Sequence, residues 1–216
     1  MNWLDAVIAA PAIGIHTGGS FERATELSKR LSPIFDRSLQ NGSVEMDITP
    51  LRVEARLENG FVVKGDVYSL AVNGPSNEAF TKCQKEALKL LKHAIDLAFI
   101  SDFQVMRIGF VVSASVDLDD LPPGIMAWKE QLVSSFSECE SANVRMRVPL
   151  RKTSLVNERC HHRLSFDRNK NSDANIYLDW QRLFLKPIRE LTTLQKEVDD
   201  CLKTSNTYFN RFGLGA

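Results

Sequence analysis

The chain has 216 residues, 44% of them hydrophobic, and its 27 basic residues balance 27 acidic ones. This length and hydrophobic content are typical of a globular chain that buries one sizeable core, so we expect a single domain over residues 1–216. The neutral balance excludes a global electrostatic field that draws a protein to nucleic acid or to an anionic membrane, so any such binding needs a local patch.

The four cysteines, Cys83, Cys139, Cys160 and Cys201, lie far apart and form no CxxC pair. This spacing favours unbridged thiols in a reduced, cytoplasmic protein. The apolar stretch at 7–15 has no basic residue before it and is interrupted by Pro11, which argues against a signal peptide. No apolar run reaches the ~18 to 20 residues that cross a bilayer, so we expect no membrane binding.

Residues 1–20 are interpreted as an N-terminal arm that leads into the first helix. Its last part, His-Thr-Gly-Gly-Ser at 16–20, puts a glycine pair before a helix, where backbone N–H groups can cradle an anion. The full phosphate-loop pattern and its lysine are missing, so a flexible loop is the better interpretation. From 21 to 35 apolar residues recur at helical spacing, which predicts an amphipathic helix.

Alternating apolar and charged residues predict two half-buried strands, over 44–48 and 51–57. Glu-Asn-Gly at 58–60 predicts a hairpin turn, because Asn and Gly tolerate the positive φ of tight turns. Residues 61–72 are then predicted to form one returning strand, with Gly65 marking a bulge.

A long helix is predicted over 77–99, where apolar residues recur at spacings of three and four. A strand follows over 107–116, and both of its faces are apolar enough for a central place in the sheet. A short helix over 125–136 places Trp128, Leu132 and Phe136 at every fourth residue.

Three more strands are predicted over 144–148, 159–166 and 175–180, with a polar hairpin loop between the last two. A final helix is predicted from about Pro187. In this order the elements predict an α+β fold with a mostly antiparallel sheet of about six to seven strands packed with amphipathic helices.

The adjacent Cys160, His161 and His162 raise the question of a metal site. Successive side chains of a strand point to opposite faces, so the two histidines cannot both bind one ion. Cys160 and His162 share a face with Leu164 and Phe166, and no further ligand with the spacing of a zinc site accompanies them. We therefore expect no metal and interpret His162 as a core histidine with a hydrogen-bond partner.

The opposite face of these late strands is predicted to be basic. Such a cluster within a neutral chain can bind phosphate groups or an acidic protein surface. The alternative is a solvated face whose charges meet the acidic strand residues Glu45, Asp47 and Glu54. The candidate anion- or partner-binding residues are Arg145, Arg147, Arg159, His161, Arg163 and Tyr177.

The last residues, 204–216, are predicted to form a contact tail. Tyr208, Phe209 and Phe212 extend beyond the apolar stripe of the final helix in a glycine-ended segment. Outside a core they would expose aromatic area to water, which favours a partner-contact surface. The alternative, packing of this segment on the chain's own sheet, stays open.

Chemical signals are sparse, and we predict no catalytic residue and no cofactor. Glu45, Asp47 and Glu54 resemble the carboxylates of metal-dependent nucleases, but no lysine stands at a fitting short spacing. Acidic alternation is also routine on exposed strands. Serine and histidine occur without a nucleophile-elbow pattern, so the sequence indicates no hydrolase.

Three segments carry a family resemblance: RIGF at 107–110, ANIYLDWQRLF at 174–184 and NTYFNRF at 206–212. Their arrangement over residues 60–212 resembles a sporadically distributed, uncharacterised family of bacterial proteins of similar size. The resemblance implies a bacterial α+β protein, an accessory component of a mobile or defence-linked operon. It implies no catalytic residues.

Strong folding signals and absent chemical ones favour a non-enzymatic interaction or accessory subunit of a bacterial multi-protein system. The expected partner is another protein or a second copy of this chain. Two alternatives stay open: a nucleic-acid or nucleotide-binding module that uses the arginine-rich strands, and an enzyme of unrecognised type.

Overall fold

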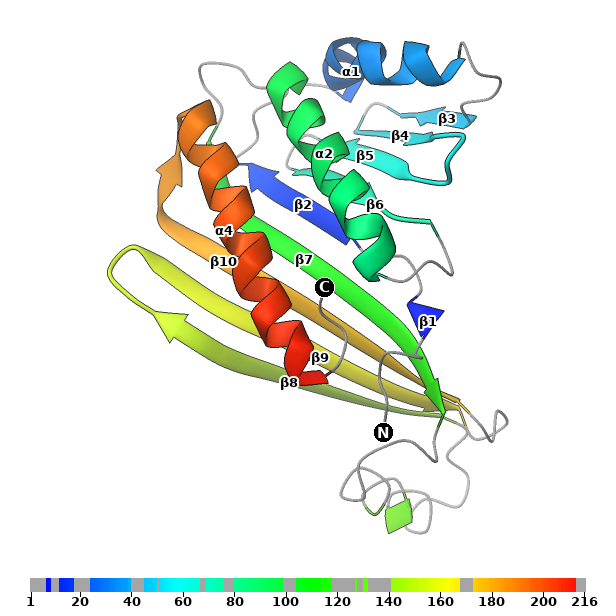
Figure 1. Ribbon diagram of the computed structural model, residues 1–216, viewed down its shortest axis with the longest axis vertical. Helices are drawn as coiled ribbons and strands as arrows, with labels where there is room; N and C mark the ends of the chain where they lie inside the picture. The colour runs from blue at the N-terminus through cyan, green and yellow to red at the C-terminus, as the bar shows by residue number, and fades with distance from the viewer. Residues whose placement is uncertain are drawn as a thin grey trace.

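A ten-stranded antiparallel sheet organises the chain, and three long helices lie on one of its faces (Figure 1). The computed structural model describes residues 7–8, 12–17, 24–39, 45–49, 51–66, 69–75, 80–98, 104–117, 127, 130–131, 141–167 and 173–212. The fold is α+β, as predicted, and the sheet is larger than the six to seven strands expected.

The sheet follows the order β3-β4-β5-β6-β2-β7-β10-β9-β8, and the short β1 pairs with β7. Every pairing between described strands is antiparallel, including those of β2 with both β6 and β7. The strands are β1 (Val7–Ile8), β2 (Ala12–Thr17), β3 (Glu45–Ile48), β4 (Arg52–Arg56), β5 (Val62–Asp66), β6 (Ser69–Asn73), β7 (Val105–Asp117), β8 (Ser141–Lys152), β9 (Val156–Asp167) and β10 (Asp173–Ile188).

Two four-stranded halves of this sheet repeat one topology, and β3 adds a further strand at the outer edge of the first half. Outward from the centre the first half runs β2, β6, β5, β4 and the second runs β7, β10, β9, β8. In each half the first strand in sequence lies at the centre and the last strand lies beside it. A helix then follows each last strand, α2 (Phe80–Ala98) after β6 and α4 (Leu191–Phe209) after β10. The halves meet where β2 pairs with β7.

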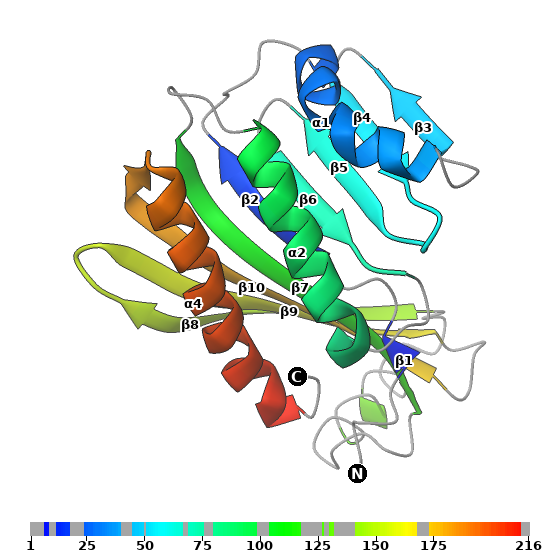
Figure 2. The same ribbon diagram turned by 45° about the horizontal axis from the view of Figure 1, so that its top comes forward.

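The core lies between the sheet and the helices. α1 (Ala24–Leu39) packs on β4 and β5, α2 on β6 and β2, and α4 on β7 and β10 (Figure 2). Ile108, Phe110 and Val112 of β7 and Trp180 of β10 are fully buried beneath them. Alternate residues of these strands point to the opposite face, which none of the described helices covers.

β2 corrects the prediction of an N-terminal arm. Residues 12–17 pair on both sides, with β6 and with β7, and occupy the middle of the sheet. The sequence Ala-Ile-Gly-Ile-His-Thr is short and rich in small residues, so its strand character comes from its neighbours rather than from its own propensity. The Gly-Gly-Ser sequence at 18–20 lies outside the described residues.

The single strand predicted over 61–72 is two strands, β5 and β6, which pair with each other. Gly65 marks no bulge: it lies opposite Val53 and Leu70 in regular register. A Cβ atom at this position would collide with Cδ2 of the fully buried Leu27 of α1. Glycine at position 65 therefore lets α1 approach the sheet closely.

Other element boundaries differ in smaller ways. β10 continues through Pro187 to Ile188, so the final helix begins at Leu191 rather than near Pro187. The helix expected over 125–136 falls almost wholly outside the described residues and stays a prediction. Cys83, Cys160 and Cys201 are buried, and Cys160 and Cys201 are free thiols, as predicted; Cys139 lies outside the described residues. Among the described helices, none is both long and apolar enough to cross a membrane.

Candidate functional site

The predicted basic residues lie together on the helix-free face of β8, β9 and β10. Strand pairing aligns Arg145 with Arg163 and Arg163 with Tyr177, and the next row aligns Arg147 with His161. Paired residues of neighbouring strands project to the same face, so the register brings all these side chains to one surface. Arg145, Arg147 and Arg163 are exposed on it.

The row that contains Arg159 forms a compact polar cluster. Gln181 of β10 lies opposite Arg159, and its Oε1 accepts hydrogen bonds from Nε and Nη2 of Arg159 at 3.2 and 3.1 Å. Arg107 of β7 donates to the same oxygen from Nη1 at 3.4 Å, and Gln181 donates from Nε2 to Oδ2 of Asp179. One neutral amide thus holds two arginines side by side.

His161 and Asp179 face each other within this surface. Nδ1 of His161 lies 3.8 Å from Oδ2 of Asp179, and the two side chains are 39% and 18% exposed. Burial lowers the pKa of His161 below its ordinary value, Arg159, Arg147 and Arg107 lower it further, and the carboxylate opposes them. Burial raises the pKa of Asp179, although its hydrogen bond from Gln181 acts in the other direction.

The arginines also act on one another. Desolvation lowers the pKa of Arg159, and the charges of Arg147 and Arg107 lower it further. The guanidinium carbon of Arg163 lies 5.0 Å from the ring centroid of Tyr177, which is a cation–π distance. The surface therefore concentrates like charge and would gain free energy from an added anion.

The alternative that the acidic strand residues neutralise this surface does not fit the strand order. Asp47 and Glu54 lie on β3 and β4, and β8 and β9 lie at the opposite end of the sheet. The two carboxylates pair locally instead: Nη2 of Arg52 lies 2.9 Å from Asp47, and Nζ of Lys64 lies 3.3 Å from Glu54. Among the described side chains, the carboxylate that lies within the basic surface is that of Asp179, which contacts His161 and Gln181.

His162 lies on the helix side of β9, as predicted for a core histidine. Its Nε2 and the hydroxyl of Tyr208 are 2.7 Å apart. Burial lowers the pKa of His162 and raises the pKa of Tyr208 to about 12. Cys160 on the same face is fully buried, and burial raises the pKa of its thiol to about 12. The described residues hold no group of His, Cys, Asp and Glu side chains able to bind a metal ion.

The predicted contact tail is wrong for Tyr208 and Phe209. They belong to α4, and their relative exposures are 8% and 0%. The helix continues two turns further than its apolar stripe suggested, so both rings pack on this chain's own sheet. Phe212 ends η3 (Asn210–Phe212), and its side chain lies outside the described part.

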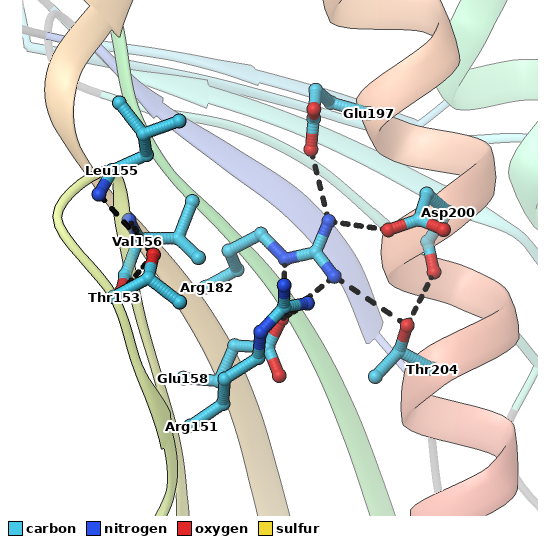
Figure 3. A network of polar contacts seen from close by, with 9 residues as sticks. All are labelled: Arg151, Thr153, Leu155, Val156, Glu158, Arg182, Glu197, Asp200 and Thr204. Carbon is cyan, nitrogen blue, oxygen red and sulfur yellow. Dashed lines mark hydrogen bonds and ion pairs between the residues drawn. The ribbon is translucent and has the colours of Figure 1, made fainter.

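A buried ionic network on the helix side was not predicted (Figure 3). Arg182 of β10 is 3% exposed, and its Nη2 lies 2.7 Å from Oε1 of Glu158, which is also 3% exposed. Its Nη1 reaches Glu197 at 2.9 Å and Asp200 at 2.6 Å on α4. The guanidinium therefore ties the last helix to the sheet. The sequence carries one signal for this burial. Arg182 follows Ile176, Leu178 and Trp180 at every second position, so strand alternation places it on the same buried face.

Sequence reasoning also missed Arg107 and Gln181 of the basic surface. The pattern at RIGF predicts a strand that is covered on both faces, which hides the role of Arg107. Gln181 belongs to no sequence motif, and its role follows only from Arg159 and Arg107 on the neighbouring strands. No protein-family model matches the chain, and a search of curated proteins finds no match. The resemblance stated for residues 60–212 therefore stays a prediction.

Proposed function

We propose that the protein is a non-enzymatic binding module whose helix-free face, at β7, β10, β9 and β8, binds the phosphate backbone of a nucleic acid. The observation that carries the proposal is the set of five arginines that strand register brings to one face, where two of them share the neutral Gln181 amide. These arginines are Arg107, Arg145, Arg147, Arg159 and Arg163.

Three physical features support a phosphate backbone as the ligand. Guanidinium groups bind phosphate oxygens in a planar, bidentate way and are weakly hydrated, which suits them to this role. Arginines at alternate positions of one strand are spaced by roughly 7 Å, and neighbouring strands add further rows, so one extended polyanion can contact several of them. A compact anion would use only one or two.

The part of the helix-free face beside the arginines is lined by small residues, which lets a nucleic-acid strand approach closely. Gly109 of β7 pairs with Gly14 of β2 and Gly14 pairs with Ala71 of β6, so small residues occupy the centre of this face. Glycine within a strand is typical of places where another backbone or a ligand comes near. The exposed guanidinium of Arg163, which lies over the Tyr177 ring, offers a planar group on which an unpaired base can stack. These features favour single-stranded nucleic acid over duplex.

The test is the salt dependence of oligonucleotide binding, measured by fluorescence anisotropy with a labelled single-stranded DNA. Arg147→Gln with Arg163→Gln should weaken binding and flatten the slope of log K against log salt by about one unit for each lost phosphate contact. The matched control is Arg52→Gln with Arg56→Gln, which makes the same charge change on the same face of the other half.

Outcomes separate the ligand classes. Equal loss in the control pair would show that net charge rather than this surface is responsible. Tighter binding of a duplex of the same sequence would replace the single-strand assignment. If the unaltered protein binds no oligonucleotide at low salt, the proposal is overturned. The same holds if both variants are folded and the first binds as tightly as the unaltered protein.

The interaction subunit expected from the sequence is a second candidate, and the β3 edge favours it. Met46 and Ile48 of this edge strand are 39% and 45% exposed, and the nearby Leu51 is 68% exposed. An edge strand with apolar side chains is a template for pairing with another chain. Met46→Lys with Ile48→Lys should abolish any self-association seen by analytical ultracentrifugation. An unchanged association state would exclude this edge.

A further inference from the structure

The positive charge of the helix-free face is concentrated along two neighbouring strands, β8 and β9. We call the basic stripe the outward residues of these strands in three successive rows of the register: Arg145 beside Arg163, Arg147 beside His161, and Pro149 beside Arg159. The row before them holds Asn143 and Ser165, which carry no charge. The basic stripe is therefore long in the direction of the strands and narrow across them.

Across the strands the positive charge stops after β9. The residues of β10 that lie opposite Arg163, His161 and Arg159 are Tyr177, Asp179 and Gln181. The same rows continue on β7 with Ser113, Val111 and Gly109. A polyanion laid across the sheet would leave the cations after two strands, and in the middle row it would meet the Asp179 carboxylate.

Along the strands, each row offers positive charge. In the first row the exposed Arg145 and Arg163 face each other, and like charges directly opposite one another destabilise a sheet. In the middle row Arg147 is exposed, and His161 adds a second cation when it is protonated.

The third row gains its second cation from β7. Arg107 lies opposite Leu183, one position further along the strands, and its Nη1 reaches Oε1 of Gln181 at 3.4 Å. Nη2 of Arg159 donates to the same oxygen at 3.1 Å, so the two guanidinium groups lie close together. An anion in each of the three rows would relieve this repulsion.

We propose that the nucleic acid runs along the basic stripe, parallel to β9, as one extended single strand with a phosphate at each of the three rows. This inference rests on the function proposed above and adds the path of the bound strand. Rows two residues apart are separated by about 7 Å, a spacing close to that of successive phosphates in an extended strand.

The width of the basic stripe suits one backbone. β8 and β9 are neighbouring strands, which lie roughly 4.8 Å apart in a sheet. Either groove that separates the two backbones of a duplex is wider, about 6 Å for the minor and about 12 Å for the major groove. The substrate class is therefore an extended single strand rather than a duplex that presents both backbones.

The salt dependence of binding tests the path, because its slope reports how many phosphates are contacted. We compare two double variants that remove the same charge, using anisotropy of a labelled oligothymidylate. The row variant, Arg145→Gln with Arg163→Gln, removes both cations of the first row. Its slope of log K against log salt should be shallower by about one unit, since one phosphate contact is lost.

The strand variant, Arg159→Gln with Arg163→Gln, removes two arginines of β9 but leaves one cation in each row, Arg145 in the first and Arg107 in the third. Its dissociation constant should rise by roughly tenfold while the slope stays unchanged, because every phosphate keeps a contact. If Arg159→Gln disturbs the fold, Arg107→Gln with Arg163→Gln makes the same test and leaves Arg159 and Arg145.

The opposite pattern would overturn the path. A strand that crosses the sheet contacts β9 once, at Arg159 or at Arg163, so the strand variant would then flatten the slope by about one unit. That result leaves the basic surface as the binding site and removes only the proposed direction. If neither folded variant changes affinity or slope, the proposed nucleic-acid function itself is wrong.

Discussion

The two halves of the sheet share a strand order but differ in the chemistry of their helix-free faces. In the first half, Arg52 and Lys64 are each paired with Asp47 or Glu54 of a neighbouring strand. In the second half, Arg159 and Arg107 converge on the neutral Gln181, and Arg163 covers Tyr177. A repeated topology therefore presents two equivalent surfaces, and the residues of one half alone turn its surface into an anion-binding candidate.

The helix sides of the two halves differ as well. α1 packs on the first half through a close contact between Leu27 and the backbone at Gly65. α4 packs on the second half through apolar residues and through the buried Arg182, which joins Glu158 of β9 to Glu197 and Asp200 of α4. Shape complementarity holds one helix in place, and a charge network contributes to holding the other.

The largest expected effect comes from breaking the charge network. Arg182→Leu leaves the 3% exposed Glu158 as a buried carboxylate whose remaining ion-pair contact is the longer one with Arg151, at 3.9 Å. The free energy of unfolding should fall by about 3–5 kcal/mol, as for other buried pairs that lose one partner. Urea denaturation followed by circular dichroism measures it.

The corresponding change in the first half is the control. Arg52→Leu removes an ion pair whose side chains are 53% and 59% exposed and should cost less than about 1 kcal/mol. Arg182→Met combined with Glu158→Leu should recover much of the loss, because no buried charge is left unpaired. Equal costs for Arg182→Leu and Arg52→Leu would contradict the network's role.

A medium effect is expected at the α1 contact. Gly65→Ala places a methyl group against Leu27 and should destabilise the protein by about 1–3 kcal/mol through overpacking. Gly109→Ala, at the centre of the opposite face, meets its nearest atom at 3.5 Å and should change stability by less than about 0.5 kcal/mol. Thermal unfolding of both variants tests this, and a larger cost for Gly109→Ala would reverse the assignment of tight packing.

The smallest expected effect is the pH dependence of oligonucleotide binding. The pKa of His161 lies below its ordinary value, so the ring is neutral near pH 7. A bound phosphate favours the imidazolium, and affinity should therefore rise as pH falls below about 6.5, by up to about tenfold for a pKa rise of ~1 unit on binding.

His161→Gln tests this dependence, because it removes the titrating ring and keeps polar character. The variant should lose the rise measured by anisotropy between about pH 7.5 and 5.5. The charged groups that face His161 are Arg147, Arg159, Arg107 and Asp179, and all are retained in the variant. An identical rise in the variant would assign the titration to Asp179, whose pKa is raised.

Strand periodicity by itself determined the membership of the basic surface. Alternation along β8 and β9 put Arg145, Arg147, Arg159, His161 and Arg163 on one face, and the register confirms that they lie together. The same parity predicted His162 in the core, where it contacts Tyr208. These predictions succeed because side-chain direction in a strand depends on local geometry alone.

Only the tertiary structure decided which groups surround that surface and what neutralises it. β2 lies between segments far apart in sequence, and its weak pattern gave no sign of a central strand. Strand order separates Asp47 and Glu54 from the arginines and brings Arg107 to Gln181. Docking of α4 on the sheet buries Arg182 of β10 and Phe209 of α4 itself. The physical reason is that pairing order and helix docking depend on contacts between distant segments, whereas periodicity reports only the face on which each residue lies.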